Sequence, residues 1–358
     1  MIDFTSALYL GMRHESGSLR PWGQLTTGAP AALTSQPGAS AVAQEVAALQ
    51  DCERGVLAPS TLHLFWDLFG ILSREKVAIY VDEGIYPIAR WGVERAAAQG
   101  VSVKTFPCHD ADGLQDRLRE DRHRRGRPVV VSDGLCPACG KVAPIAAYLD
   151  SMRVFGGYLI LDDTQALGIL GHAPGPAAPY GKGGGGSLRW SDVSGPDLLV
   201  VSSLAKGFGV PVAVLSGSRA TVGHFEAKSE TRVHCSPPSM AVIHAAAQAL
   251  EVNDGHGDPL RLRLALRVRY FRDKLLEIGL STGGGPFPVQ TLLLQPDINV
   301  IFLYERLIQL GIRTVLHRNR NGNGARISFI VTALHSQSDI IRAVDVLSYA
   351  LMRQCANR

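Results

Sequence analysis

The sequence has little of what marks secreted, disulfide-bonded or membrane-embedded proteins. Its six cysteines are spread over 358 residues, which is too sparse for a disulfide scaffold. No apolar run approaches the length that crosses a bilayer. The N-terminal residues also lack a basic segment followed by a long apolar stretch, which a secretion signal would have. We therefore expect a cytoplasmic protein with no membrane partner.

Charge of either sign is also modest. The chain has 36 basic and 32 acidic residues, a formal net charge of +4, and such a small excess does not call for a nucleic-acid partner. Hydrophobic residues make up 46% of the chain. That share is enough for a large buried core, in one big domain with a smaller one beside it.

What is present is an alternation of short apolar strands and helices after about residue 40. Helices are expected at 41–52, 62–72, 87–99, 112–123, 143–151, 240–252, 260–278, 299–310 and 339–352. Strands are expected at 77–81, 101–106, 129–132, 158–162, 198–202, 312–316 and 327–331. This alternation implies crossover connections and a mostly parallel sheet covered by helices on both faces.

Residues 171–197 interrupt the alternation. This segment holds prolines at 174, 176 and 179 and four consecutive glycines at 183–186. Such a composition is not expected to pack densely, so we predict a mobile surface loop or lid. The glycines lack the GxxxxGK[ST] arrangement and are not interpreted as a phosphate cradle.

Two charged residues stand where apolar strands are expected to end, the edge at which open α/β sheets bind their ligands. Lys206 lies in a glycine-flanked turn at 202–209 (SSLAKGFG). A lysine that is partly desolvated there has a lowered pKa and can form a Schiff base. Asp162 ends the strand at 158–162, where a carboxylate can pair with a protonated pyridine nitrogen. Taken singly, Lys206 could be an ordinary surface lysine, and Asp162 a metal ligand or a helix cap.

Two further features suit a cofactor with a phosphate and a flat ring. Ser60 and Thr61 precede the helix expected at 62–72, which Leu62 begins. The exposed N–H groups at the start of this helix and the two hydroxyls suit a phosphate ester. The alternative at this position is a simple helix cap. Tyr86 follows the expected strand at 77–81, where its ring could stack on a flat cofactor or only pack against neighbours.

These four features follow one another along the chain in the order typical of fold-type I enzymes of pyridoxal phosphate (PLP). The order is a phosphate-binding loop, a stacking aromatic residue, an aspartate at a strand end and a lysine at a strand end. On this order and on several motifs the chain resembles the α-oxoamine synthases, such as 8-amino-7-oxononanoate synthase, 2-amino-3-ketobutyrate ligase and serine palmitoyltransferase. The similar segments are 7–11 (ALYLG, family NxYLGL), 106–110 (FPCHD, family FxHND), 133–144 (DGLCPACGKVAP, family EGxxSMDGxxAPL), 161–168 (LDDTQALG, family VDDAHGxG), 201–209 (VSSLAKGFG, family TxxKxxG), and 325–328 (ARIS) with 332–335 (TALH, family ARxRxxxSAAH). The lysine and aspartate motifs are the specific ones among them.

The resemblance implies a role for each matching residue. Lys206 would hold PLP and move the Cα proton, and Asp162 would bind the pyridinium. Ser203 would contact the phosphate together with the Ser60–Thr61 amides. Ser236 would reach the phosphate of a neighbouring subunit, because the family's sites form across a homodimer interface. Further cofactor or substrate contacts are implied for Tyr9, Leu62, Tyr86, Asp133, Gln165, Arg326 and Ser328.

Departures from the family pattern bear on the substrate. Gln165 stands for the histidine that bonds the ring oxygen, and an amide can donate that bond but cannot titrate. Tyr86 stands for the histidine that stacks on the ring, although a two-residue shift would place Gly84 there. Ser328 stands for the arginine that clamps the amino-acid carboxylate, and a hydroxyl does not replace a guanidinium. Either another arginine supplies that contact or the substrate is held differently. The candidates are Arg313, Arg318, Arg320 and Arg326.

Cys136 and Cys139 have the spacing of a redox motif or of half a zinc site. No second pair follows at zinc-finger spacing and no thioredoxin-like pattern surrounds them, so we predict no metal site. In the resemblance, residues 137–140 (PACG) replace the substrate-loop motif SMDG.

We predict a fold-type I, aspartate aminotransferase-like α/β fold. It has an N-terminal segment 1–40 joining the small domain, a large PLP-binding domain 41–240 with a mostly parallel seven-stranded-type sheet, and a small α+β domain 241–358.

The predicted function is a PLP-dependent transferase that forms a Cα carbanion from an amino acid or a derivative. Like the α-oxoamine synthases, it would then transfer an acyl group from acyl-CoA or an acyl-carrier thioester with decarboxylation, on a non-standard substrate of specialised metabolism. Two alternatives stay open. One is a PLP aminotransferase or a β/γ-elimination or replacement enzyme, for example on a sulfonium amino acid. The other is a non-catalytic PLP-fold partner protein.

Overall fold

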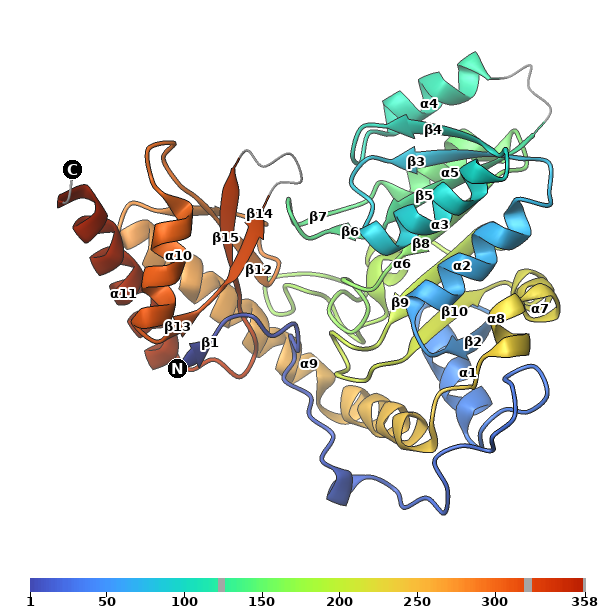
Figure 1. Cartoon of the computed structure of the whole chain (residues 1–358), viewed down its shortest axis with the longest axis horizontal. Coiled ribbons are helices and arrows are strands. Elements are labelled where there is room, and N and C mark those ends of the chain that lie inside the picture. Colours follow the sequence, from blue (N-terminus) through green and yellow to red (C-terminus); the bar gives the residue numbers. More distant parts are fainter. Residues whose placement is uncertain (122–125, 319–323, 357–358) are drawn as a thin grey trace.

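A seven-stranded sheet forms the centre of the larger part of the molecule (Figure 1). The computed structural model describes residues 1–121, 126–318 and 324–356. The strands, in sheet order, are β2 Arg54–Ala58, β10 Ala213–Gly217, β9 Leu198–Ser203, β8 Tyr158–Asp162, β5 Arg127–Asp133, β3 Val77–Asp82 and β4 Ser102–Phe106. Neighbours from β9 to β4 pair parallel, and β10 runs antiparallel to both β9 and β2. The predicted α/β fold with a mostly parallel sheet is confirmed.

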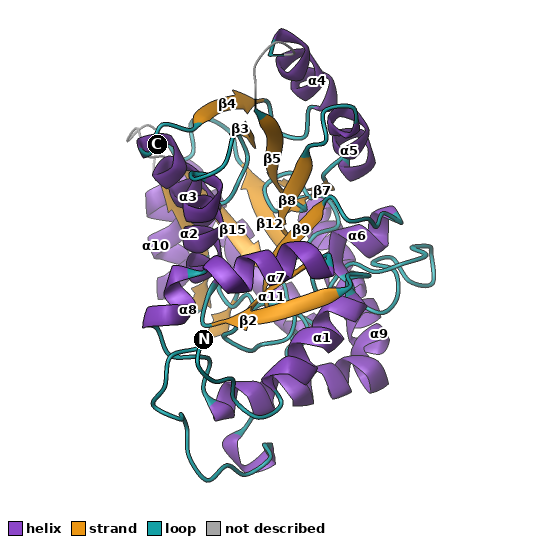
Figure 2. Cartoon of the chain, turned by 90° about the vertical axis from the view of Figure 1, so that its right-hand side faces the viewer, coloured by secondary structure: helices purple, strands orange, loops and turns teal. Residues whose placement is uncertain are grey.

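Helices cover both faces of this sheet, as expected from its largely apolar central strands β3, β5, β8 and β9. Alternate residues of β3 enter different cores: Ile79 and Val81 pack with α2 and α3, whereas Ala78 and Tyr80 pack with α4 and α5. Figure 2 shows these two helix layers on opposite sides of the strands. The helices around the sheet are α1 Ala39–Leu49, α2 Thr61–Leu72, α3 Pro87–Ala98, α4 Ala111–Glu120, α5 Ile145–Arg153, α6 Gly186–Ser191, α7 Arg219–Lys228 and α8 Glu230–His234.

A second, antiparallel sheet with two helices forms the C-terminal part. Its strands, in order, are β11 Ser281–Gly283, β12 Val289–Leu293, β15 Ala325–Ile330 and β14 Val315–Arg318, and its helices are α10 Val300–Gln309 and α11 Gln337–Ala356. The N-terminal strand β1, Ile2–Asp3, pairs with β13, Ile312–Arg313, so the start of the chain lies with this part. The long helix α9, Met240–Glu277, connects it to the large sheet (Figure 1). The exact division into domains stays a prediction.

Several expected elements differ in the structure. The helices at 240–252 and 260–278 are one helix, α9, with Pro259 inside it. The buried Arg261 guanidinium donates to Asn253 Oδ1 on the same helix (2.8 Å) and to the Gly168 carbonyl (3.0 Å). A side-chain bond within the helix and a tertiary contact thus support it across the residues that local sequence marks as a break. The helix expected at 112–123 ends at Glu120, and His123 lies outside the described residues. The strands β2, β10 and β12 were not predicted, because their short apolar runs carry no clear alternation.

The prediction of a poorly packed lid at 171–197 is wrong. Tyr180, Ser187 and Leu188 are buried in this segment, and the Gly183 N–H and C=O bond the side chains of Asp258 and Asn253 on α9. The glycines allow this packing, because they let the backbone approach its neighbours where a side chain would collide.

Replacing Gly186 with alanine is therefore expected to lower the free energy of unfolding by about 2–4 kcal/mol. Gly186 has φ +85° and its Cβ would overlap the Asp163 carboxylate, so the substitution adds both backbone strain and a clash. Gly175→Ala in the same segment is the control, because no atom of the described residues, other than those of its chain neighbours, lies within 4 Å of the Cβ position at Gly175. Urea unfolding of both variants measures the effect. Equal destabilisation of the two would contradict the close packing.

None of the helices in the described part of the chain combines the length and apolar character that crossing a membrane requires.

Candidate active site

The carboxyl ends of β5, β8 and β9 open into a pocket of about 230 Å³. Its walls are Thr61, Tyr86, Ile88, Asp133, Asp162, Thr164, Gln165, Ser203 and Lys206. Apart from Ile88 and Thr164, every one of these residues was singled out from the sequence. Because parallel strands end at the same edge of a sheet, residues distant in the chain converge there.

Lys206 lies just beyond β9, next to two carboxylates. The register places Asp162 beside Asp133 on β5 and beside Val201 on β9. Burial lowers the pKa of Lys206, while the charges of Asp162 and Asp133 raise it, and the net change is downward. The Tyr86 ring lies over the amine, with its centroid 5.5 Å from Lys206 Nζ. A lysine amine that loses its proton more easily is a better nucleophile and base.

Burial raises the pKa of both carboxylates in the pocket, Asp162 and Asp133. Burial raises the pKa of Asp162, against hydrogen bonds from Thr164 and the charge of Lys206. Asp162 Oδ1 accepts from the Thr164 N–H at 3.0 Å. Burial and the neighbouring Asp162 raise the pKa of Asp133 well above its usual value, and Asp133 Oδ1 accepts from the Tyr86 N–H at 3.1 Å. The pocket thus holds two acidic groups against one lysine, which favours a further positive partner.

Gln165 lines the pocket, and Tyr9 lies next to it. The Tyr9 hydroxyl donates to Gln165 Oε1 at 2.7 Å, and burial raises the pKa of Tyr9. Because Tyr9 occupies the amide oxygen, the amide nitrogen is the group of Gln165 that can donate into the pocket. Tyr9 itself is buried behind Gln165.

The start of α2 supplies the polar end of the pocket. Thr61 is the first residue of α2 and Ser60 its cap, and the N–H groups of a first helical turn have no partner within the helix. Ser60 Oγ bonds His63 Nδ1 at 2.9 Å, and Ser203 Oγ accepts from the Ala205 N–H at 3.2 Å. Leu62 is 42% exposed and does not line the pocket.

A family model described as "Aminotransferase class I and II" matches residues 31–303. That range covers most of the chain and includes every residue of the pocket. The chain belongs to this family. A curated relative, 8-amino-7-oxononanoate synthase of Pseudescherichia vulneris, is 28% identical over 259 residues, which are 71% of this chain and 63% of the relative's length.

Solved structures of similar proteins have the same fold. Serine palmitoyltransferase of Sphingomonas wittichii superposes with a TM-score of 0.84 at 16% identity, over 99% of this chain and 88% of that one. Serine palmitoyltransferase of S. paucimobilis, solved with bound PLP, has a TM-score of 0.83 at 15% identity and the same coverage. The predicted resemblance of this class I and II family member to the α-oxoamine synthases is confirmed as a distant homology.

Other residues proposed from the sequence lie away from the lysine pocket. Ser328 on β15 is fully buried, and its hydroxyl bonds Thr291 Oγ1 at 2.7 Å. Ser236 is exposed in the loop between α8 and α9. Arg313 pairs with Asp3 at 4.0 Å. Gly84, the alternative to Tyr86, packs against Cys108 rather than in the pocket. Arg320 lies outside the described residues.

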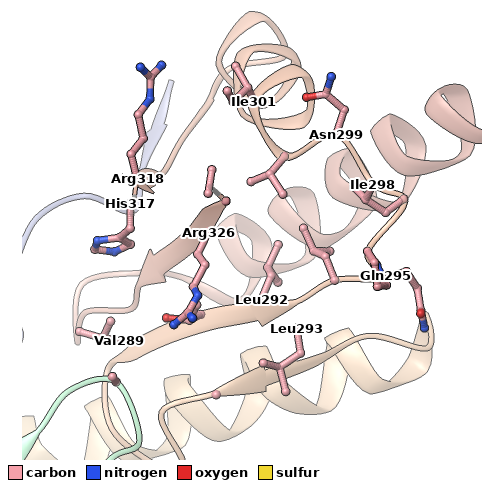
Figure 3. Close-up of a pocket in the computed structure, with 18 of the residues that line it drawn as sticks. Val289, Leu292, Leu293, Gln295, Ile298, Asn299, Ile301, His317, Arg318 and Arg326 are labelled. Carbon is pink, nitrogen blue, oxygen red and sulfur yellow. The ribbon is translucent and has the colours of Figure 1, made fainter. Parts of the chain in front are cut away.

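Arg318 and Arg326 instead line a second cavity, of about 1180 Å³ (Figure 3). One part of its wall is apolar, from Val289, Leu292, Leu293, Ile298 and Ile301. The two arginines and His317 give it a cationic side, and burial together with the charge of Arg326 lowers the pKa of His317. Pro137 and Ala138, in the loop that follows Asp133 of the lysine pocket, form another part of the wall.

Ile88 and Thr164 line the pocket but were not predicted from the sequence, and no role was assigned to Asp163 behind it. Thr164 Oγ1 accepts from the Ser203 N–H at 3.1 Å and so ties the end of β8 to the end of β9. Asp163 is fully buried behind the pocket, where it accepts from the Ser187 N–H (3.0 Å). The sequence does contain a sign of Asp163 and Thr164, the run Asp162-Asp163-Thr164 at the end of β8. Polar residues directly after a buried strand cannot face water and need hydrogen-bond partners.

The Asp163→Asn variant is expected to remove a pH dependence of stability. Burial, against hydrogen bonds from Ser187, raises the pKa of Asp163 from 3.8 to about 7. The folded chain then binds a proton between these values that the unfolded chain releases, so stability falls as pH rises through this window, by on the order of 4 kcal/mol. Urea unfolding at pH 4 and pH 8 should show this loss in the wild type and a smaller loss in the variant. The exposed Asp116→Asn serves as control, and an equal slope in the wild type and the Asp163 variant would contradict the prediction.

Proposed function

We propose that this chain is a PLP-dependent acyltransferase of the α-oxoamine synthase type, which joins an acyl group to the Cα of an amino acid or a derivative. The observation that carries the proposal is the meeting of Lys206 and Asp162 in one pocket beneath the Tyr86 ring. Membership of the aminotransferase class I and II family supports it.

The chemistry of the pocket fits PLP. A protonated pyridine nitrogen against Asp162 would supply the positive partner that the two buried carboxylates call for. The phosphate would be held by the N–H groups at Thr61 and by Ser203, and the ring would lie against Tyr86. The Gln165 amide nitrogen would donate to the ring oxygen.

When bound, PLP withdraws electrons from the substrate Cα and so makes its bonds easier to break. Lys206 would hold the cofactor through its amine and would move the proton at Cα, for which its lowered pKa is suited. Asp162 would keep the pyridine nitrogen protonated. Because an amide does not titrate, Gln165 donates its hydrogen bond over a wide range of pH.

The second cavity supports an acyl thioester as co-substrate. Its apolar wall suits an acyl chain, and Arg318 and Arg326 suit the phosphates of CoA or of a carrier-protein arm. The loop from Asp133 to Ala138 contributes to both cavities, so a donor in the second cavity would lie close to the residues that line the first.

A second candidate is a PLP-dependent aminotransferase or a β/γ-elimination or replacement enzyme. Ser328 favours it, because its buried hydroxyl is bonded to Thr291 and offers no clamp for a substrate carboxylate. A substrate that carries its own positive charge, such as a sulfonium amino acid, would interact with the two carboxylates without that clamp.

We also propose a homodimer in which the exposed Ser236 of one subunit reaches the phosphate site of the other. The expected substrates are small molecules of the cytoplasm.

The test is exchange of the Cα proton in D₂O with glycine, alanine and serine, followed by mass spectrometry of products with a panel of acyl-CoAs. We expect exchange with at least one amino acid and a condensation product that requires the thioester. Conversion of the cofactor to its amine form without a thioester would favour transamination. No spectral response to any amino acid would overturn the proposal.

A further inference from the structure

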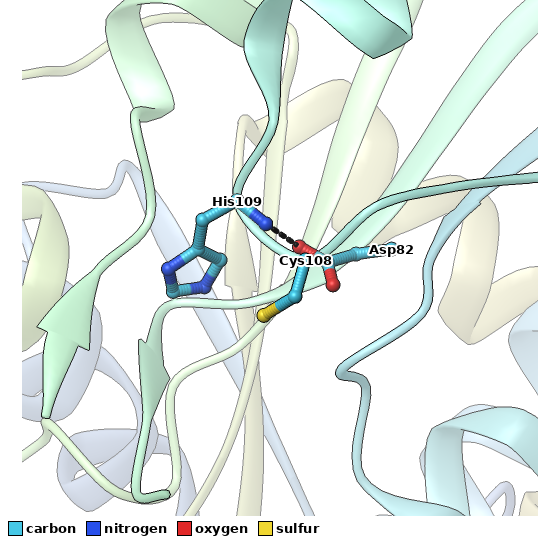
Figure 4. Close-up of side chains that lie close together, drawn as sticks. All are labelled: Asp82, Cys108 and His109. Carbon is cyan, nitrogen blue, oxygen red and sulfur yellow. Dashed lines mark hydrogen bonds between the residues drawn. The ribbon is translucent and has the colours of Figure 1, made fainter. Parts of the chain in front are cut away.

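Asp82, Cys108 and His109 meet at the carboxyl ends of two neighbouring strands. Asp82 is the last residue of β3, and Cys108 and His109 follow the end of β4, which pairs parallel with β3. A carboxylate oxygen, the thiol sulfur and an imidazole nitrogen, one atom from each residue, all lie within 4.8 Å of one another. In Figure 4 the Cys108 sulfur and the His109 ring extend to the same side. The strand ends thus bring together three kinds of metal-binding atom.

Hydrogen bonds fix the buried Asp82 carboxylate and leave part of it open. Its Oδ2 accepts from the His109 N–H (3.0 Å) and from the hydroxyls of Ser132 (3.0 Å) and Tyr148 (3.4 Å). Its Oδ1 accepts from the Gly84 N–H at 2.7 Å. Because an ionised carboxylate has about four lone-pair sites, Oδ1 keeps a second lone pair for the thiol or for a metal ion. Carboxylates that bind metals are held by outer hydrogen bonds of this kind.

The lack of a side chain at Gly84 leaves space beside the sulfur and this oxygen. A Cβ atom at Gly84 would lie 2.5 Å from Cys108 Sγ and 3.1 Å from Asp82 Oδ1, so the two atoms border one position next to the backbone. Partial burial and the charge of Asp82 raise the pKa of the Cys108 thiol. A cation bound to both groups would offset the repulsion between them.

His109 is placed beside Cys108 at a conformational cost. Its φ is +57°, in the left-handed region, which few residues other than glycine adopt and which costs free energy. The Nδ1 atom of its ring is buried and has no hydrogen-bond partner in the described ranges. Strained backbone and unpaired buried polar atoms are typical of functional sites.

We propose that Asp82 Oδ1, Cys108 Sγ and one ring nitrogen of His109 bind a Zn²⁺ ion. Zinc takes oxygen, sulfur and imidazole nitrogen as ligands, whereas Mg²⁺ and Ca²⁺ prefer oxygen alone. Cys108 is exposed, so the fourth position of a tetrahedral ion would be open to water. Three protein ligands and one open position differ from the closed set of four that holds a permanent structural zinc, so we expect an ion that a chelator can remove.

Such an ion would lie next to the lysine pocket. Asp82 begins the turn that leads to Tyr86, whose ring lies over Lys206. Ser132, which bonds Asp82, directly precedes Asp133 of the pocket. Zinc would therefore stabilise the strand ends from which two walls of the pocket come, and the unfolding temperature should rise when zinc is added.

The test is zinc binding by the full chain as purified, without a histidine tag, stripped of metal and kept reduced. Zn²⁺ is titrated in competition with a chromophoric chelator, and we expect one tight site per chain. Cd²⁺ in place of zinc should give the ultraviolet charge-transfer band of a thiolate ligand, at wavelengths shorter than the absorption of PLP. Loss of a ligand should weaken zinc binding by more than about 100-fold, beyond the effect of losing an outer partner.

Four variants separate the ligands from their surroundings. Cys108→Ser and His109→Asn each remove a ligand, and asparagine tolerates the left-handed conformation at this position. Gly84→Ala changes no ligand but fills the space beside Sγ and Oδ1, and it should weaken binding as strongly. Ser132→Ala removes only an outer partner of Asp82 and should weaken binding by about 10- to 100-fold.

Cys139→Ser and Gly223→Ala are the matched controls. Cys139 is exposed like Cys108, and at Gly223 no atom of the described residues beyond its own helix backbone and chain neighbours lies within 4 Å of the Cβ position. Both should keep the wild-type affinity, and circular dichroism shows whether each variant is folded. Folded wild type that binds no zinc, binding that survives Cys108→Ser or His109→Asn, or binding lost with Cys139→Ser would each overturn the site. These readouts require neither PLP nor turnover, so they stand apart from the proposed function.

Discussion

The Lys206→Ala variant should lose Cα proton exchange and turnover by about 10⁴-fold or more. Lys206 is the buried amine beside Asp162 and Asp133, and no other lysine lines the described pocket. Its loss removes both the group that holds the cofactor and the base that moves the Cα proton, and general-base catalysis alone is worth about 10²–10⁴-fold. The rate of exchange in D₂O, followed by NMR, measures the effect.

Chemical rescue separates this role from a structural one. Added methylamine should restore part of the exchange in Lys206→Ala, because a free amine can enter the space of the lost side chain, whereas it cannot repair a misfolded pocket. Borohydride should fix the cofactor to the wild type at the Lys206 peptide and leave the variant unlabelled. Lys228→Ala, at an exposed position on α7, is the control. A variant without Lys206 that still carries a reducible linkage and exchanges at the wild-type rate would refute the assignment.

The core of the site was predictable because it depends on one geometric rule. In a parallel sheet the residues that follow the strands converge at one edge, so Asp162 and Lys206 could be placed together from the strands alone. Tyr86 follows the same rule, and its ring does lie over Lys206.

Residues outside that rule were not predictable. Ser328 was carried over by motif position, but which face of β15 it occupies depends on the register of the smaller sheet, where it bonds Thr291. The glycines at 183–186 suggested disorder, although contacts with Asn253 and Asp258 on α9 order them.

The Asp162→Asn variant should lower turnover by about 10²–10³-fold, the range typical of removing one preorganised electrostatic group from an active site. The carboxamide still accepts the hydrogen bond of the Thr164 N–H, so the fold of the strand end should be kept. It cannot carry the negative charge that holds a proton on a pyridine nitrogen, and PLP without that proton is a weaker electron sink.

Asp163→Asn is the matched control for Asp162→Asn, because the two carboxylates are adjacent and both buried but Asp163 bonds Ser187 instead of lining the pocket. Steady-state rates at the pH optimum should fall less than about threefold for Asp163→Asn, against the 10²–10³-fold loss for its neighbour. Equal losses would mean that both residues affect activity only through the stability of the fold, because only Asp162 lines the pocket. A selective loss at Asp162, with cofactor still bound and the protein still folded, is the result that only direct contact with the ring explains.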